Sequence, residues 1–157
     1  MENQIKTGFD TIEISADFNV NIKRGKVFKC NSPFQIKEGI LYIKNDDGSV
    51  ELVLPEVLIE TISVESENGS IHVRDVCSKE FILRADFSVE IKTVSFEKID
   101  ISSENGSVRI KYKGTGEVYA DCHSENGTIK TKGPFYGTEE CERKIIVNAD
   151  FNITLSV

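Results

Sequence analysis

The chain has 157 residues, of which 39% are apolar and 29% charged, so it is long enough for one domain with an ordinary hydrophobic core. Its net charge of -7 is spread along the chain, which argues against binding nucleic acid or an anionic membrane through bulk electrostatics. No apolar run approaches the roughly 20 residues of a membrane-spanning helix. The first six residues lack the pattern of a signal peptide. We therefore expect no membrane insertion and a cytoplasmic location as written, or the cell surface or envelope if the chain is a fragment of an exported parent.

The elements expected along the chain are nearly all short β-strands. Residues with β-branched side chains alternate with polar ones, and helical spacing is nearly absent. Turn formers such as Arg24-Gly25 and Asp46-Asp47-Gly48 separate the runs. We predict a single domain over residues 1–157, in which residues 1–8 form an N-terminal cap segment, residues 9–56 irregular opening coils and residues 57–157 regular repeats.

One four-residue motif, Ser-Glu-Asn-Gly, occurs three times, at Ser66–Gly69, Ser103–Gly106 and Ser124–Gly127, and an alternating strand pattern follows each copy. Because Asn-Gly tolerates a positive φ, each copy is interpreted as a structural turn. The predicted structural turn residues are Asn68, Gly69, Asn105, Gly106, Asn126 and Gly127. The asparagines also suggest a hydrogen-bonded ladder, above all between Asn105 and Asn126, which are expected one coil apart.

A second motif, Ala-Asp-Phe, begins at Ala16, Ala85 and Ala149 and looks like another version of the same corner, with its phenylalanine expected in the core. Asn-Gly between alternating runs also fits an antiparallel β-sandwich. The intervals between successive corners from Ser66 onward are 18 to 25 residues, which favour one coil per corner. The predicted fold class is all-β, a single-stranded β-helix (β-solenoid) of roughly seven short coils, each stacked on its predecessor.

With the repeats laid out, the chain resembles the bacterial putative-adhesin β-strand-repeat domains of unknown function, a group that includes the head GIN domains. The residues that carry the resemblance are Gly39–Ile43, Val50–Pro55 and the repeated pattern that begins at Ile62, and it covers about residues 9–157. It implies a single-stranded β-helix of a kind often found in surface or envelope proteins, with no catalytic residues to transfer.

No catalytic or metal-binding motif interrupts the repeats, so we expect no enzyme, no cofactor and no metal. Cys122 and His123 adjoin, but neighbouring strand residues point to opposite faces and make a poor nucleophile and base pair. The four cysteines lack metal-ligand spacing and are expected to be reduced thiols. A pairing across coils, between Cys77 and Cys122 or between His72 and His123, stays open.

Two surfaces are candidate sites. Glu67, Glu104 and Glu125 occupy equivalent corner positions, so they form a possible acidic stripe for a hard cation such as Ca²⁺ or, more simply, a solvated face. The chain also finishes on an alternating run without a cap, and Ile153, Leu155 and Val157 are therefore a possible end-to-end interface.

The function that the sequence favours is a non-enzymatic structural or interaction module, an adhesin-like β-solenoid. It would act on a protein partner through its surface, or on itself through end-to-end, head-to-tail association. The alternative is an ion- or ligand-binding module that uses the acidic stripe at the corners. A polysaccharide-cleaving enzyme is disfavoured, because the loops are too short to build a catalytic groove.

Overall fold

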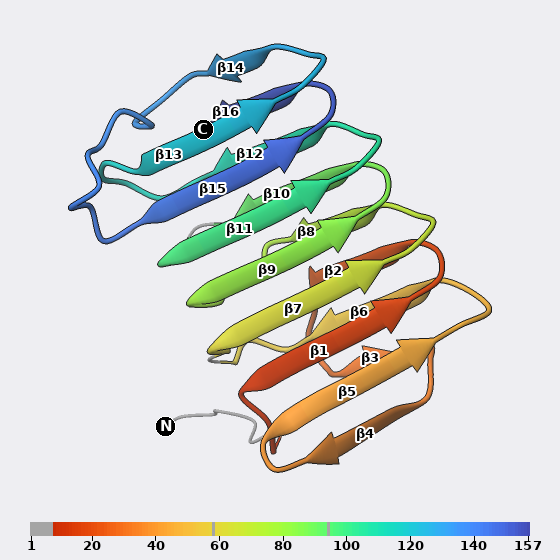
Figure 1. The fold of residues 1–157 in the computed structure, drawn as a ribbon. Helices are drawn as coiled ribbons and strands as arrows, with labels where there is room; N and C mark the ends of the chain where they lie inside the picture. The colour runs from red at the N-terminus through yellow and green to blue at the C-terminus, as the bar shows by residue number, and fades with distance from the viewer. Residues whose placement is uncertain (1–7, 58, 94) are drawn as a thin grey trace, which may run out of the picture.

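The computed structural model describes residues 8–57, 59–93 and 95–157, and these residues form two sheets of eight strands each. We call them the front and rear sheets after Figure 1. The front sheet runs, in spatial order, β13 (Tyr119–Ser124), β15 (Lys144–Ala149), β11 (Lys98–Ser103), β9 (Glu80–Ala85), β7 (Thr61–Ser66), β1 (Thr11–Ala16), β5 (Ile40–Asn45) and β4 (Phe34–Lys37). The rear sheet runs β14 (Ile129–Thr131), β16 (Ile153–Ser156), β12 (Val108–Tyr112), β10 (Val89–Thr93), β8 (Ile71–Arg74), β2 (Val20–Arg24), β6 (Val50–Leu54) and β3 (Lys29–Cys30). The prediction of an all-β chain is confirmed.

Seven strand-corner-strand repeats build the two sheets, and each repeat places its first strand in the front sheet and its second in the rear sheet. All neighbouring repeats pair in parallel. The core lies between the sheets because alternate residues of every strand point inward. In β1, for example, Ile12, Ile14 and Ala16 are buried whereas Glu13 and Ser15 between them are exposed. The fold is therefore β-solenoid-like, with two parallel-rich sheets.

The repeats do not stack in chain order. The first repeat, β1 and β2, lies between the second (β5 and β6) and the third (β7 and β8). The last repeat, β15 and β16, lies between the fifth (β11 and β12) and the sixth (β13 and β14), as Figure 1 shows. The prediction that each coil stacks on its predecessor is wrong at these two places. Intervals along the chain set the length of a repeat, but they do not say which repeat it lies beside.

The segment between the first two repeats runs against the others. β3 pairs antiparallel with β6, and β4 pairs antiparallel with β5. A tight turn joins β4 to β5, with a φ of 54° at Glu38 and 80° at Gly39, as a two-residue hairpin requires. Two early stretches, Ser32–Ile36 and Asn45–Val50, have sequences that resemble degenerate copies of the corner motif. The first is not a corner, because it runs into the hairpin strand β4, whereas the second contains the corner between β5 and β6. The predicted cap over residues 1–8 lies outside the described residues except for Gly8.

The outermost layer at the other end of the stack is formed by β13 and β14. Their inward positions hold Ala120, Cys122 and Ile129, which pair with the buried Ile145, Val147 and Ile153 of the last repeat. Ile129 is exposed because no further layer covers it. Small or partly polar residues at this layer reduce the apolar area left open at the end, as expected of a terminal repeat. No helix long and apolar enough to cross a membrane occurs in the part of the chain that is described.

Candidate functional site

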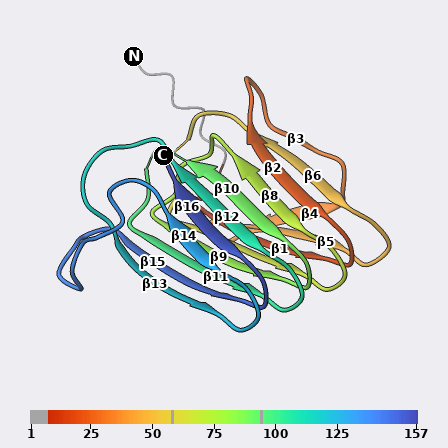
Figure 2. The ribbon, with the colours of Figure 1, turned by 90° about the horizontal axis from the view of Figure 1, so that it is seen from above.

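The corners of the repeats lie along one side of the stack, where the front sheet turns into the rear sheet (Figure 2). We call this row the corner ridge, and it consists of the following segments: residues 16–19, 45–49, 66–70, 85–88, 103–107, 124–128 and 149–152. We refer to Ser-Glu-Asn-Gly as the Asn-Gly corner and to Ala-Asp-Phe as the Phe corner. The two kinds alternate along the ridge because the first and last repeats are inserted out of chain order.

An Asn-Gly corner and a Phe corner hold each other by a repeated set of hydrogen bonds. The Asn105 side-chain amide donates to the Asp86 carboxylate over 2.6 Å, and the Asn105 backbone N–H donates to the Asp86 carbonyl over 2.7 Å. The same side-chain and backbone bonds join Asn68 to Asp17 and Asn126 to Asp150. The expected ladder between Asn105 and Asn126 is therefore wrong, because a Phe corner separates their repeats.

The serine of each Asn-Gly corner caps the neighbouring Phe corner. The Ser103 hydroxyl is buried and donates to the Phe87 carbonyl. The same bond runs from Ser66 to the Phe18 carbonyl and from Ser124 to the Phe151 carbonyl. A hydrogen bond of this kind contributes about 0.5–1.5 kcal/mol, so this serine stabilises the turn that presents the phenylalanine.

The glycine of the Asn-Gly corner is required by close packing and not by its backbone conformation. A Cβ atom added to Gly106 would lie 2.4 Å from the carbonyl carbon of Phe87. A Cβ atom added to Gly69 or Gly127 would approach the carbonyl carbon of Phe18 or Phe151 about as closely. None of these glycines or their asparagines is among the described residues with a positive φ. The turn residues were predicted at the right positions, but the predicted reason, a positive φ at Asn-Gly, is wrong.

Each Phe corner exposes its aromatic side chain. The exposed fractions are 45% for Phe18, 46% for Phe87 and 45% for Phe151. The prediction that these side chains fill the core is wrong, because the inward position of the corner belongs to the alanine of the motif, which is buried in all three copies. Neighbouring strands lie about 4.8 Å apart, so phenylalanines on every second repeat recur roughly every 10 Å along the corner ridge.

Acidic residues flank this aromatic row, but they do not converge. Glu67, Glu104 and Glu125 stand on every second repeat, so they are also roughly 10 Å apart. Oxygen ligands of one Ca²⁺ all lie within about 2.6 Å of the ion, which this separation forbids. No group of three or more His, Cys, Asp or Glu side chains that could hold a metal occurs in the described ranges. The corner residues thus do not support the acidic stripe as an ion site.

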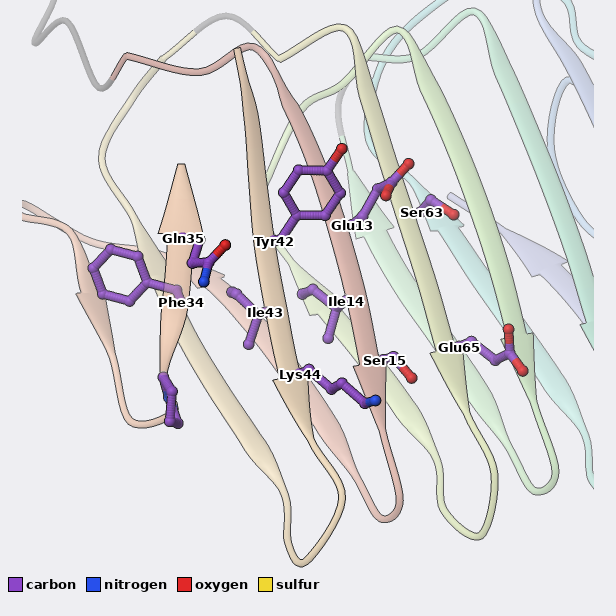
Figure 3. A pocket seen from close by; sticks show the side chains of 11 residues that line it. Glu13, Ile14, Ser15, Phe34, Gln35, Tyr42, Ile43, Lys44, Ser63 and Glu65 are labelled. Carbon is purple, nitrogen blue, oxygen red and sulfur yellow. The ribbon is translucent and has the colours of Figure 1, made fainter. Parts of the chain in front are cut away.

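Hollows also occur on the front sheet and beside the corner ridge. A hollow of about 710 Å³ lies over β4, β5, β1 and β7, and Figure 3 shows Tyr42 and Glu13 on one part of its wall and Lys44, Ser15 and Glu65 on another. Two hollows of about 230 and 270 Å³ lie beside the corner ridge and are lined mainly by acidic and serine side chains, and His123 also lines the larger of the two. The 710 Å³ hollow has no cysteine or histidine in its lining to serve as nucleophile or base.

Cys122 and His123 point to opposite faces of β13, as predicted. Cys122 pairs with the buried Val147, whereas His123 pairs with the exposed Asn148. Burial, together with the negative charge of Asp121, raises the pKa of the Cys122 thiol to about 11. The side chain is therefore a neutral thiol at neutral pH, and a neutral thiol is a weak nucleophile. Cys77 belongs to the loop after β8, four repeats from Cys122 in the stack, so they do not pair.

The C-terminal strand does not form an end of the stack. Ile153 and Leu155 of β16 are fully buried, and β16 pairs with β12 on one side and β14 on the other. Val157, after the strand, is 48% exposed. The predicted end-to-end interface through Ile153, Leu155 and Val157 is wrong, because the last repeat is inserted between the fifth and sixth.

The aromatic row could not be found from the sequence without the order of the repeats. The sequence does contain one signal, a shared pattern in which Asp-Phe is followed by Asn or Ser and then by a core valine or isoleucine. The pattern occurs at Phe18, Phe87 and Phe151. Two polar neighbours around one large apolar residue are typical of an exposed turn. The spacing of the phenylalanines, however, follows from insertion of the first and last repeats, which no local motif encodes.

Comparison with known proteins agrees with this architecture. The crystal structure of a "putative cell adhesion protein" from Clostridium sporogenes ATCC 15579 superimposes with a TM-score of 0.69 at 12% identity, covering 95% of this chain and 93% of that one. A "putative adhesin" from Bacteroides fragilis NCTC 9343 covers 94% of this chain and 91% of its own, at 10% identity and a TM-score of only 0.37. At these identities the first likeness concerns the fold alone. No protein with a curated description matches in sequence.

A family profile matches most of the chain. The matched segment, residues 8–134, contains the first six repeats and stops before the inserted last repeat. The match supports the expected relation to a β-repeat family of unknown function, although not its head GIN name. The chain belongs to the Toastrack DUF4097 family.

Proposed function

We propose that the protein is a non-enzymatic interaction module, a β-solenoid-like scaffold that binds a protein partner through its corner ridge. The observation that carries the proposal is the row of Phe18, Phe87 and Phe151 at equal steps along one edge. A single exposed apolar residue on a surface needs no explanation, but three in register on one edge form a recurrent apolar surface. The description of the Clostridium sporogenes neighbour as a "putative cell adhesion protein" supports the same proposal.

The three phenylalanines of the ridge leave apolar area that a partner would bury on binding. A phenylalanine buries roughly 200 Å² when fully enclosed, so side chains exposed to about 45% have roughly 90 Å² each left to bury. At 25 cal/mol per Å² that area is worth about 2 kcal/mol for each ring. The corners that carry the rings are fixed by hydrogen bonds before binding, which lowers the entropic cost of ordering them.

The lateral edge is a better binding surface than the two ends of the stack. One end is finished by the antiparallel β3 and β4, and β3 has only two residues. The other end is finished by β13 and β14 with small or partly polar inward residues. Short or irregular edge strands discourage pairing with another chain. We therefore place recognition on the corner ridge and not on end-to-end association.

The experiment is staining of bacterial and animal cells with the biotinylated chain on fluorescent streptavidin, read by flow cytometry. The test variant carries Phe18→Ser, Phe87→Ser and Phe151→Ser. The matched control carries three substitutions of exposed apolar residues away from the ridge, Val27→Ser, Tyr42→Ser and Tyr136→Ser. Circular dichroism and melting temperature confirm that both variants are folded.

We expect the unmodified chain to stain a cell surface in a manner abolished by pretreating the cells with protease. The ridge variant is expected to lose at least tenfold in staining, and the control variant to stay within twofold. Equal staining by the ridge variant, or no staining of any surface tested, would overturn the proposal.

A further inference from the structure

The outer face of the rear sheet carries a single-file row of basic side chains. Lys23, Arg74, Lys92 and Lys111 each follow a buried core residue, so all four side chains point away from the core. The strand register places Lys23 opposite Arg74, Arg74 opposite Lys92, and Lys92 opposite Lys111. Four consecutive parallel strands, β2, β8, β10 and β12, therefore present like charges side by side.

The row continues in both directions without an acidic residue. On one side, Lys23 pairs with Val53 of β6, and Val53 pairs with Lys29 of β3. On the other side, Lys111 pairs with Ser156 of β16. Lys132, directly after β14, donates its backbone N–H to the Leu155 carbonyl over 2.9 Å, which brings it next to Ser156. Six of these eight positions are basic, in a chain with 19 Lys and Arg and a net charge of -7. We call the eight residues the basic row.

The arrangement is unfavourable for the isolated protein. Like charges directly opposite each other on neighbouring strands are destabilising, and about 4.8 Å is well within the screening length at physiological salt. Only Lys92 has an acidic partner within the described residues, Asp75 at 3.6 Å. The carboxylates in the adjacent row are engaged elsewhere, Glu90 with Arg109 and Glu51 with Asn21. The positive charge of the row is therefore largely uncompensated within the molecule.

We propose that the basic row binds an acidic polysaccharide, a linear chain that bears carboxylate or sulfate groups and lies across the strands. The charges follow one line at strand spacing, over roughly 34 Å for all eight positions, which matches an extended polymer and not a compact ligand. The adjacent row offers Asn21, His72 and Thr154 as hydrogen-bonding partners for sugar hydroxyls.

The same face is less suited to the other polyanions. Single-stranded nucleic acid is usually bound with aromatic side chains that stack on bases, and the outward positions of the rear sheet contain no Phe or Tyr. An anionic membrane is contacted by a broad basic surface, whereas here the adjacent row sets two acidic residues, Glu90 and Glu51, against two basic ones, Arg109 and Lys130. The aromatic residues of the corner ridge lie at the edge and not on this face.

The test measures the affinity of the full chain for fluorescent polygalacturonate, dextran sulfate, neutral dextran, an oligothymidylate and phosphatidylserine vesicles, at low and physiological salt. The test variant carries Lys23→Gln, Arg74→Gln, Lys92→Gln and Lys111→Gln. The matched control removes the same charge from the front sheet by Lys37→Gln, Lys44→Gln, Lys98→Gln and Lys144→Gln. Removing the row relieves repulsion, so the test variant is expected to melt no lower than the unmodified chain.

We expect a charged polysaccharide to bind, with weaker binding at higher salt, and neutral dextran not to bind. The test variant is expected to lose at least 30-fold in affinity and the control variant less than threefold. Equal losses in the two variants would show that net charge and not the row is responsible, and would overturn the proposal. Tighter binding of the oligothymidylate or the vesicles, or no polysaccharide binding, would overturn it as well.

Discussion

Asn105 binds Asp86 twice, once through its side-chain amide at 2.6 Å and once through its backbone N–H at 2.7 Å, although the two residues lie 19 positions apart in the sequence. This pair joins an Asn-Gly corner to the Phe corner of the neighbouring repeat. The same pair recurs at each of the three Asn-Gly corners. The two sequence motifs are therefore complementary halves of one contact and not two versions of one corner.

We expect the Asn105 and Asp86 side chains to stabilise the fold jointly. In a double-mutant cycle of Asn105→Ala and Asp86→Ala, the coupling is expected to be about 0.5–1.5 kcal/mol, the usual range for a hydrogen bond. Urea unfolding of the four proteins measures it. The control cycle combines Asp86→Ala with Asn126→Ala, whose partner is Asp150, and should show coupling near zero. Comparable coupling in both cycles would contradict the pairwise contact.

We predict that the glycine of an Asn-Gly corner cannot carry a side chain. Gly106→Ala places a methyl group 2.4 Å from the Phe87 carbonyl carbon, which is backbone and cannot move freely. The expected cost is about 1–3 kcal/mol of unfolding free energy. Gly48→Ala is the matched control from another corner, because its nearest contact is an ordinary 3.4 Å to the Asn45 side chain. A control loss as large as that of Gly106→Ala would refute close packing as the reason for this glycine.

Leu155 is expected to matter for folding and not for assembly. Leu155→Lys buries a charge in the fully enclosed layer of β16 and should cost more than about 3 kcal/mol or prevent folding. Val157→Lys, only two residues later, changes a 48% exposed side chain and should cost less than about 0.5 kcal/mol. Thermal melting distinguishes the two. A well-folded Leu155→Lys protein would show that β16 is not enclosed between β12 and β14.

The thiol of Cys122 is expected to react slowly at neutral pH. Burial and the charge of Asp121 both oppose the thiolate, so the pKa is raised from the ordinary value of 9.0 to about 11. The measurement is the pH dependence of iodoacetamide labelling in a variant that keeps Cys122 and replaces Cys30, Cys77 and Cys141 by serine. The native protein should show a midpoint near 11, and the same variant in urea a midpoint about two units lower. Coincident midpoints would contradict the buried environment.

Much of the fold could be predicted from local pattern. Alternation of apolar and polar residues in segments such as Ile99–Ile101 sets the strands, and the corner motifs mark where each repeat turns. The pattern also contains the basic row, because Lys23, Arg74, Lys92 and Lys111 all come directly after the second core residue of a rear strand. Their alignment becomes visible only when the strands are placed in register.

The order of the repeats could not be predicted, because it depends on contacts between residues far apart in the chain. Every repeat has a similar length and a similar apolar core, so stacking in chain order looks equally favourable. The difference lies in the corners: two Asn-Gly corners side by side would place an asparagine next to another and not next to the aspartate that it binds. The predicted interface at the C-terminus was wrong for this reason. The phenylalanines were wrongly expected in the core for a local reason, because the alanine of each Phe corner takes the inward position.

The most direct test of the alternating corner ridge is disulfide trapping of the repeat order. In a variant without native cysteines, Arg109→Cys with Thr154→Cys joins residues that are opposite each other on β12 and β16. Arg109→Cys with Lys130→Cys joins β12 to β14, with β16 between them. A disulfide requires Cα atoms less than about 7 Å apart, and two strand steps of about 4.8 Å exceed this. Rapid oxidation of the first pair and not the second is the expected result, whereas oxidation of the second pair and not the first would contradict the inserted repeat and, with it, the spacing of the phenylalanines.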